Sequence, residues 1–191
     1  MNEYGKKLFY VQRPLLQNLD EFRNSCSTSE QTIVLGCYKT NVGIYIYGIE
    51  DSRLQGVKQV TAAHEMLHAA YDRLSQSEKN KVNQLTLSAF NQLTDERVKK
   101  NIESYRTRDA SVVPNELHSI LATEVDSLPP ELEQYYKKYF IDRHKIVAFS
   151  NQYEGEFTRR ESAIDAYDKQ LEDTKSSIFN KFTKQIIRAA R

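Results

Sequence analysis

The chain has 191 residues, a length typical of one domain or of one domain with an appendage. Its 27 Lys and Arg residues balance 26 Asp and Glu residues, and the net charge of +1 excludes a broad electrostatic attraction to nucleic acid or to an anionic membrane surface. Hydrophobic residues make up 39% of the chain and aromatic residues 10%, enough for a core, so extensive disorder is not expected.

The chain carries no segment of the type that spans a membrane or directs export. Its longest apolar run lies around Gly43–Tyr47 and is far shorter than the roughly 18 residues that a transmembrane helix needs. No apolar signal-peptide region follows Met1, so an anchor would have to lie in a preceding segment. We therefore expect no membrane contact within these residues and no nucleic-acid partner.

The first fifty residues predict a small sheet and one helix. Two runs rich in β-branched and aromatic residues, Gln31–Tyr38 and Gly43–Ile49, predict strands. Asn41 in the loop between them favours an antiparallel hairpin. The short apolar run Leu8–Val11 predicts a further strand, and the proline that opens Pro14–Phe22 favours a helix there.

After Gly56 the apolar period changes to three and four, which predicts a series of helices. The first runs from Val57 to about Leu74. Ser75 and Glu78 have the spacing of a capping box and begin the next helix. Further helices are expected after a cap at Thr94 or Asp95, over Glu116–Val125, and, past the break at Leu128–Pro130, over Glu131–Phe140.

From about Lys145 the composition predicts a long exposed helix or a weak coiled coil. The apolar residues that alternate at three and four along it are Phe157, Ile164, Tyr167, Leu171 and Ile178. The other faces carry mixed charge. The alternative is a C-terminal helix that packs back on the domain.

Together these elements predict an α+β, mostly helical fold. A small antiparallel sheet precedes the helices, a domain covers residues 1–145, and a helical extension covers 146–191. Through this extension the chain can associate with itself or with a partner helix.

Residues 64–68 carry the pattern His-Glu-x-x-His within the first predicted long helix. His64 and His68 lie one turn apart on one face, so both imidazoles can bind one Zn²⁺. Glu65 lies about 100° further round the helix and can take a proton from a zinc-activated water without ligating the metal. The pattern therefore predicts a zinc-dependent enzyme in which water attacks a carbonyl carbon.

A catalytic zinc needs a third protein ligand. Asp72 is the nearest carboxylate, but ligands at i, i+4 and i+8 span about 12 Å along a straight helix and cannot converge on one ion. Glu116, in the first turn of a later predicted helix, is the favoured third ligand. Glu124, two turns beyond it, and His118 are the alternatives. Without a metal, Glu116 would be a carboxylate stabilised by the helix dipole.

His64-Glu65-x-x-His68 followed by a glutamate on a later helix resembles the gluzincin branch of the zincin metallopeptidases, in particular the single-domain minigluzincins. The wider stretches 60–71 and 115–140 resemble uncharacterised bacterial proteins described as metalloproteases. The zincin pattern itself covers five residues and one glutamate, so it specifies a metal better than a substrate.

This resemblance implies that the small sheet lies before the motif helix and that its edge strand pairs with an extended peptide or protein substrate. It assigns this place to Gly43–Ile49, whose substrate-binding residues would be Ile44, Tyr45, Ile46 and Tyr47. It implies peptide-bond hydrolysis with Zn²⁺ as cofactor and Glu65 as general base. Tyr71 and His118 are the candidates for a residue that stabilises the transition state.

Two interpretations without catalysis stay open. The chain can be a catalytically inactive zincin-like module that keeps a metal site and binds a partner through its long helix. Alternatively, the zinc can be purely structural. The presence of Glu65 argues against both, because neither needs a carboxylate beside an open coordination position.

The two cysteines, Cys26 and Cys37, exclude a disulfide-dense scaffold and a cysteine-only zinc site. A disulfide between them is favoured, which is typical of an oxidising, extracytoplasmic compartment. The alternative is a pair of buried thiols in a cytoplasmic protein. The bacterial proteins that the chain resembles carry an upstream membrane anchor, which implies an extracytoplasmic or cell-surface location in a bacterium.

Overall fold

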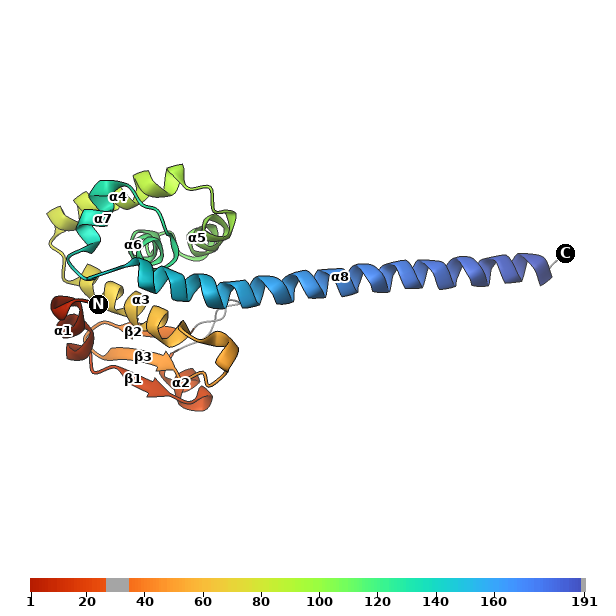
Figure 1. The fold of residues 1–191 in the computed structure, drawn as a ribbon, viewed down its shortest axis with the longest axis horizontal. Coiled ribbons are helices and arrows are strands. Elements are labelled where there is room, and N and C mark those ends of the chain that lie inside the picture. Colours follow the sequence, from red (N-terminus) through yellow and green to blue (C-terminus); the bar gives the residue numbers. More distant parts are fainter. Residues whose placement is uncertain (27–34, 190–191) are drawn as a thin grey trace. The chain divides into compact units, whose positions relative to one another are not determined.

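The computed structural model describes residues 1–26 and 35–189 and has an α+β, mostly helical fold (Figure 1). The chain divides into two compact units, Met1–Tyr153 (unit 1) and Glu154–Arg191 (unit 2). Within the described residues, no helix has a stretch long and apolar enough to cross a membrane.

From Val57 onward, the helices of unit 1 follow one another with short connections. In the described part of the chain they are α1 (Glu3–Val11), α2 (Leu19–Ser25), α3 (Val57–Asp72), α4 (Gln76–Gln92), α5 (Glu96–Arg108), α6 (Val113–Glu124) and α7 (Pro130–Tyr136). A short 3₁₀ helix, Ser52–Leu54, precedes α3. Helix α8 (His144–Ala189) begins in unit 1 and continues through unit 2.

Three strands form one mixed sheet in the order β1-β3-β2: β1 (Leu15–Gln17), β2 (Gly36–Lys39) and β3 (Gly43–Tyr47). The predicted antiparallel hairpin is confirmed as β2 and β3, and Asn41 in its turn has a left-handed φ of 62°. β1 pairs parallel to β3, so the sheet is not antiparallel throughout. Gln31–Val34 of the predicted strand Gln31–Tyr38 lie outside the described residues.

Two predicted elements near the N-terminus are wrong. The predicted strand Leu8–Val11 is the end of helix α1, because Asn2 caps that helix by accepting a 2.9 Å hydrogen bond from the Gly5 amide. The predicted helix Pro14–Phe22 is strand β1 followed by α2. Helix α2 starts later than predicted because Asn18 and Glu21 form a capping box that fixes its N-terminus.

The predicted starts of α4 and α5 are confirmed, whereas α6 begins at Val113, three residues before the predicted start at Glu116, and α7 ends at Tyr136 instead of Phe140. Ser75 and Glu78 form the expected capping box at the N-terminus of α4, and the Asp95 side chain caps α5. Gly56 precedes α3 with a φ of +88°, a conformation that favours glycine. A Cβ at that position would also lie 2.6 Å from the Cβ of Phe149. The start of α3 is therefore fixed both by backbone conformation and by packing.

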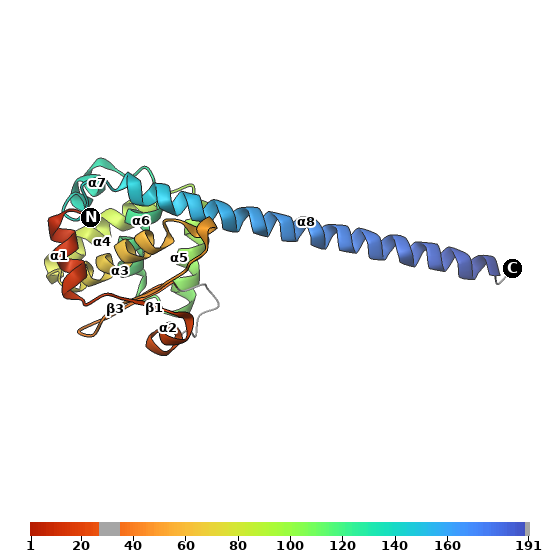
Figure 2. The ribbon, with the colours of Figure 1, turned by 60° about the horizontal axis from the view of Figure 1, so that its bottom comes forward.

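Helix α3 lies between the sheet and α6 in both views (Figures 1 and 2). It packs against β2 and β3 on one side and α6 on the other, and small residues at its centre permit this close approach. The fully buried apolar residues of α3 and α6 include Ala63, Met66, Leu67, Ala69, Leu121 and Ala122. The His-Glu-x-x-His segment is thus held rigidly at the middle of unit 1.

The boundary between the two units falls after Tyr153, later than the predicted boundary after residue 145. The first turns of α8 explain the difference. Val147, Ser150 and Tyr153 recur at intervals of three and are buried, so this part of the helix belongs to the packed unit.

Cys26 and Cys37 form a disulfide with Cα atoms 6.0 Å apart, which confirms the favoured pairing. The bond joins the end of α2 to strand β2. Disulfides are typical of oxidising compartments. The extracytoplasmic or cell-surface location stays a prediction, because a bond in the folded chain does not determine the compartment.

Reduction of this disulfide is expected to lower the stability of the protein. The bond closes a loop with a sequence separation of 11. A loop of this size corresponds to about 2–3 kcal/mol of unfolding free energy, or a fall in Tm of about 4–12 °C for a unit of this length. Thermal unfolding with and without a phosphine reductant measures the effect.

The double variant Cys26→Ser/Cys37→Ser is the matched control for this experiment. It should show the lower Tm in both conditions. Intact mass after alkylation of the native protein gives an independent answer, since two thiols modified without reductant would show that the bond does not form.

Candidate metal centre

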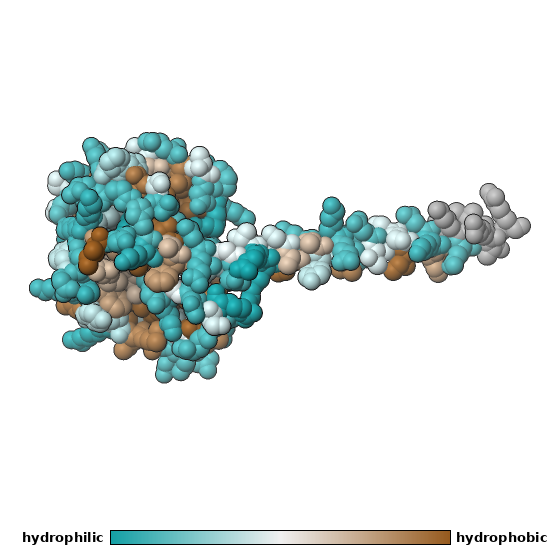
Figure 3. Space-filling model, viewed as in Figure 1, coloured by the Kyte–Doolittle hydropathy of each residue, from teal (hydrophilic) through white to brown (hydrophobic). Residues whose placement is uncertain are grey.

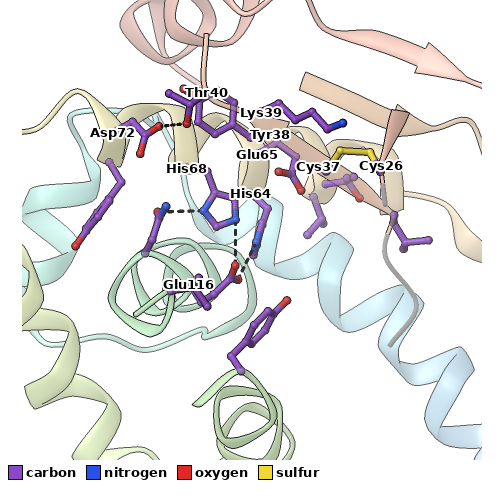
Figure 4. A pocket seen from close by; sticks show the side chains of 18 of the residues that line it. Cys26, Cys37, Tyr38, Lys39, Thr40, His64, Glu65, His68, Asp72 and Glu116 are labelled. Atoms are coloured by element: carbon purple, nitrogen blue, oxygen red, sulfur yellow. Dashed lines mark hydrogen bonds and ion pairs between the residues drawn. A yellow bond between two sulfur atoms is a disulfide. The ribbon is translucent and has the colours of Figure 1, made fainter. Parts of the chain in front are cut away.

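Three potential metal ligands from two helices converge in unit 1 (Figure 4). His64 and His68 come from α3 and Glu116 from the first turn of α6. The Nε2 atom of His64 lies 3.6 Å from Glu116 Oε2, and that of His68 lies 3.7 Å from Glu116 Oε1. The two imidazole rings meet nearly edge to face, with centroids 4.6 Å apart.

The spacing of these donor atoms fits one Zn²⁺ ion. One ligand atom of each residue lies within 4.8 Å of the others. Zinc at its usual bond lengths of about 2.0–2.2 Å places tetrahedral donors about 3.3 Å apart, so only small side-chain movements are needed. Glu116 Oε2 is buried and has no hydrogen-bond partner among the described residues, a need that a bound cation would meet.

The charge on Glu116 is favoured by its neighbours. Burial alone raises the pKa of this carboxyl group, but His64 and His68 lower it by more, and the net pKa lies below the usual value. Glu116 is therefore a carboxylate near neutral pH. An anionic oxygen beside two imidazoles is a common ligand set for catalytic zinc.

Asn115 and Ser119 orient His68. His68 Nδ1 lies 3.0 Å from Asn115 Oδ1 and 3.3 Å from the Ser119 hydroxyl, both on α6. The amide oxygen only accepts, so Nδ1 carries the proton, and the lone pair of Nε2 is directed at the cluster. This is the arrangement that fixes the tautomer of metal-binding histidines. In the sequence, the one indication that Asn115 lies near the metal ligands is that it directly precedes Glu116.

Glu65 is buried between α3 and strand β2, with only 5% of its surface exposed. A Cβ at Gly36 would lie 2.9 Å from Glu65 Oε1 and would also collide with Thr61. The absence of a side chain at Gly36 thus lets the strand backbone approach the carboxylate closely. Glu65 lines the same cavity as the two histidines without being one of the three converging ligands.

A cavity of about 610 Å³ surrounds the cluster. One wall is β2 with its disulfide, the floor is α3, and the opposite wall comes from α5 and α6. The lining also includes Val60, Leu35 and Tyr153, together with the polar residues Thr40 and Asp72. Its volume suits a peptide segment rather than a single small ion.

The predicted edge strand is wrong. β3 is the central strand of the sheet, because β1 occupies the edge that was expected to be open. Ile44 and Ile46 are buried in the core, and Tyr45 and Tyr47 pair with Leu15 and Gln17 of β1. These four residues therefore cannot pair with a substrate. The strand that borders the cavity is β2, which among the described residues has a strand partner on one side only.

Of the alternative ligands, Glu124 is held elsewhere. Arg97 Nη1 donates a 2.6 Å hydrogen bond to Glu124 Oε2. Asp72 accepts a 2.7 Å hydrogen bond from the hydroxyl of Thr40 at the end of the cavity, in accordance with the helix-length argument. The geometry thus brings Glu116, and not these two carboxylates, to the histidines.

His118 and Tyr71 do not present a proton donor to the cavity. His118 is fully buried, and its Nε2 lies 2.9 Å from the Tyr135 hydroxyl. Burial lowers the pKa of His118 to about 3, so the ring stays neutral. Tyr71 lines the cavity, but its hydroxyl donates a 2.9 Å hydrogen bond to Asn83 Oδ1 within the fold. Tyr105, which no motif indicated, is the tyrosine of α5 that lines the cavity.

The chain matches no protein-family model, no curated protein and no solved structure. Two imidazole side chains, one carboxylate ligand and one further buried carboxylate form a set that can hold zinc and move a proton beside it.

Proposed function

We propose that this protein is a zinc-dependent peptidase of the zincin type. The observation that carries the proposal is that ligand atoms of His64, His68 and Glu116 lie within 4.8 Å of one another. The buried carboxylate of Glu65 follows His64 directly in the sequence. A structural zinc site needs no such carboxylate. The cavity beside an edge strand of the sheet supports a peptide as the substrate.

In this proposal His64, His68 and Glu116 hold the metal, and Asn115 keeps His68 in the correct tautomer. When bound, Zn²⁺ lowers the pKa of water towards 7 and polarises a carbonyl group. Glu65 accepts the proton of the attacking water and transfers it to the nitrogen of the departing amine. The bond that breaks is the amide C–N bond, and the products are a carboxylate and an amine.

The backbone of β2 positions the substrate in the same proposal. An extended peptide can add by main-chain hydrogen bonds to the side of this short strand that has no strand partner among the described residues, and such bonds supply affinity with little dependence on sequence. The close approach of Gly36 to Glu65 would bring the peptide backbone and the general base together.

Metal removal tests the proposal. The protein should contain one zinc per chain by mass spectrometry of the metal, and it should cleave members of a diverse peptide library. A chelator should abolish cleavage, and added Zn²⁺ should restore it. If the zinc-loaded chain leaves the whole library intact, the inactive binding module is the better description.

A further inference from the structure

Within unit 2, helix α8 carries an exposed apolar stripe. Seven large side chains along it are each more than half exposed: Ile164, Tyr167, Leu171, Ile178, Phe179, Phe182 and Ile186. At 100° per residue they occupy an arc of about 120°, the width of a stripe that normally packs against another element. Apolar side chains recur along this helix in Figure 3. Amphipathic helices derive most of their stability from such packing.

The charges of unit 2 are segregated along its length. Residues 154–173 contain seven Asp and Glu against three Lys and Arg, whereas residues 174–191 contain five Lys and Arg and no acidic residue. The helix dipole does not explain the acidic half, because it begins more than two turns after the start of α8 at His144 and the effect fades within the first turn.

We propose that unit 2 forms an antiparallel helix pair with unit 2 of a second copy of this chain. In a parallel pair the acidic halves would lie side by side and repel. In an antiparallel pair each acidic half lies along the basic half of the other copy, and the two-fold axis makes every such contact occur twice. A membrane surface is a poorer occupant of the stripe, since the acidic half would repel anionic lipids.

The stripe and two charged residues define the register of this pair. Asp168 and Lys175 lie on the apolar side of the helix, within about 40° of Ile164. If the pair is centred between Leu171 and Glu172, Asp168 of each copy is level with Lys175 of the other. The same register brings the two Leu171 side chains together at the centre and places Ile164 close to Ile178.

The existing partner of Lys175 does not oppose this arrangement. Its Nζ lies 2.7 Å from Glu172 Oε1 within the same helix, and both side chains are exposed. Exposed ion pairs of this kind contribute little and rearrange easily. Lys175 can therefore serve Asp168 of the second copy.

Sedimentation velocity of the full chain over a wide range of concentration tests the proposal. A reversible monomer–dimer equilibrium is expected. Asp168→Lys should raise the dimer dissociation constant about ten-fold, because two attractive pairs become two repulsive ones. Lys175→Asp should do the same. The double variant Asp168→Lys/Lys175→Asp should return to the wild-type constant, since exchanging the two charges restores both attractive pairs.

Asp173→Lys is the matched control, because it makes the same charge change on the opposite side of the helix and should weaken the dimer much less. Circular dichroism of each variant establishes that α8 remains helical. A chain that is monomeric at all concentrations would overturn the proposal. So would equal effects of Asp168→Lys and Asp173→Lys, or a double variant that fails to recover.

Discussion

Replacing Glu116 by alanine is expected to remove stoichiometric zinc, whereas Glu124→Ala should leave it bound. Both carboxylates line the cavity, but only Glu116 lies within 4.8 Å of the two histidine donors. Glu124 is paired with Arg97. Zinc affinity should fall by more than about 100-fold in Glu116→Ala, beyond the 10–100-fold loss typical of groups that only orient a ligand.

Competition with a chromophoric chelator measures these affinities. The zinc affinity of His68→Ala should match that of Glu116→Ala, because either change leaves two protein ligands. The zinc affinity of Asn115→Ala should lie between that of these two variants and that of the wild type. If Glu124→Ala loses zinc and Glu116→Ala keeps it, the ligand assignment is wrong. Stoichiometric zinc in the His64→Ala/His68→Ala double variant would contradict the metal centre as a whole.

The helical part of the fold was predictable because its signals are local. The alternation of apolar residues along α3, the capping box at Ser75 and the cap at Asp95 each act within one or two turns. The pairing of His64 with His68 has the same origin, since two residues one turn apart share a face wherever the helix packs.

The N-terminal elements show where local reading fails. A four-residue apolar run such as Leu8–Val11 suits a strand or a buried helix equally, and the deciding cap, Asn2, lies outside it. Asn18 and Glu21 have capping-box spacing that would have placed the start of α2 correctly. Pro14 favours a helix start at position 14, but proline also precedes strands, as it does here before β1.

The sheet order could not be derived from local patterns. β1 pairs with β3 across nearly thirty residues, in parallel, and no short-range turn specifies such a contact. Once β1 fills that edge, β3 becomes central, and among the described strands the edges are β1 and β2, of which β2 borders the cavity. The approach of Glu116 to the two histidines is likewise a long-range contact, since two helices separate α6 from α3 along the chain. Glu116 was favoured on its position in the helix, and the distances to the histidines support that choice.

Glu65→Gln separates an enzyme from a metal-binding scaffold. Glutamine has nearly the size of glutamate and fits the space beneath Gly36, so the fold should persist. Zinc should also stay bound, because Glu65 is not among the three converging ligands. The amide, however, cannot accept a proton from water. Turnover should therefore fall by about 10²- to 10⁴-fold, the range that a positioned general base contributes.

Glu124→Gln is the matched control for this variant, since it makes the same chemical change at another carboxylate that lines the cavity. Its turnover should stay within a few-fold of the wild type. Peptide cleavage by equal amounts of zinc-loaded protein gives the comparison, with Tm and bound zinc measured on the same samples. Full activity in Glu65→Gln would exclude Glu65 as the general base. Loss of both zinc and turnover would instead assign it to the support of the metal centre, because a residue that acts only on the proton leaves the metal in place.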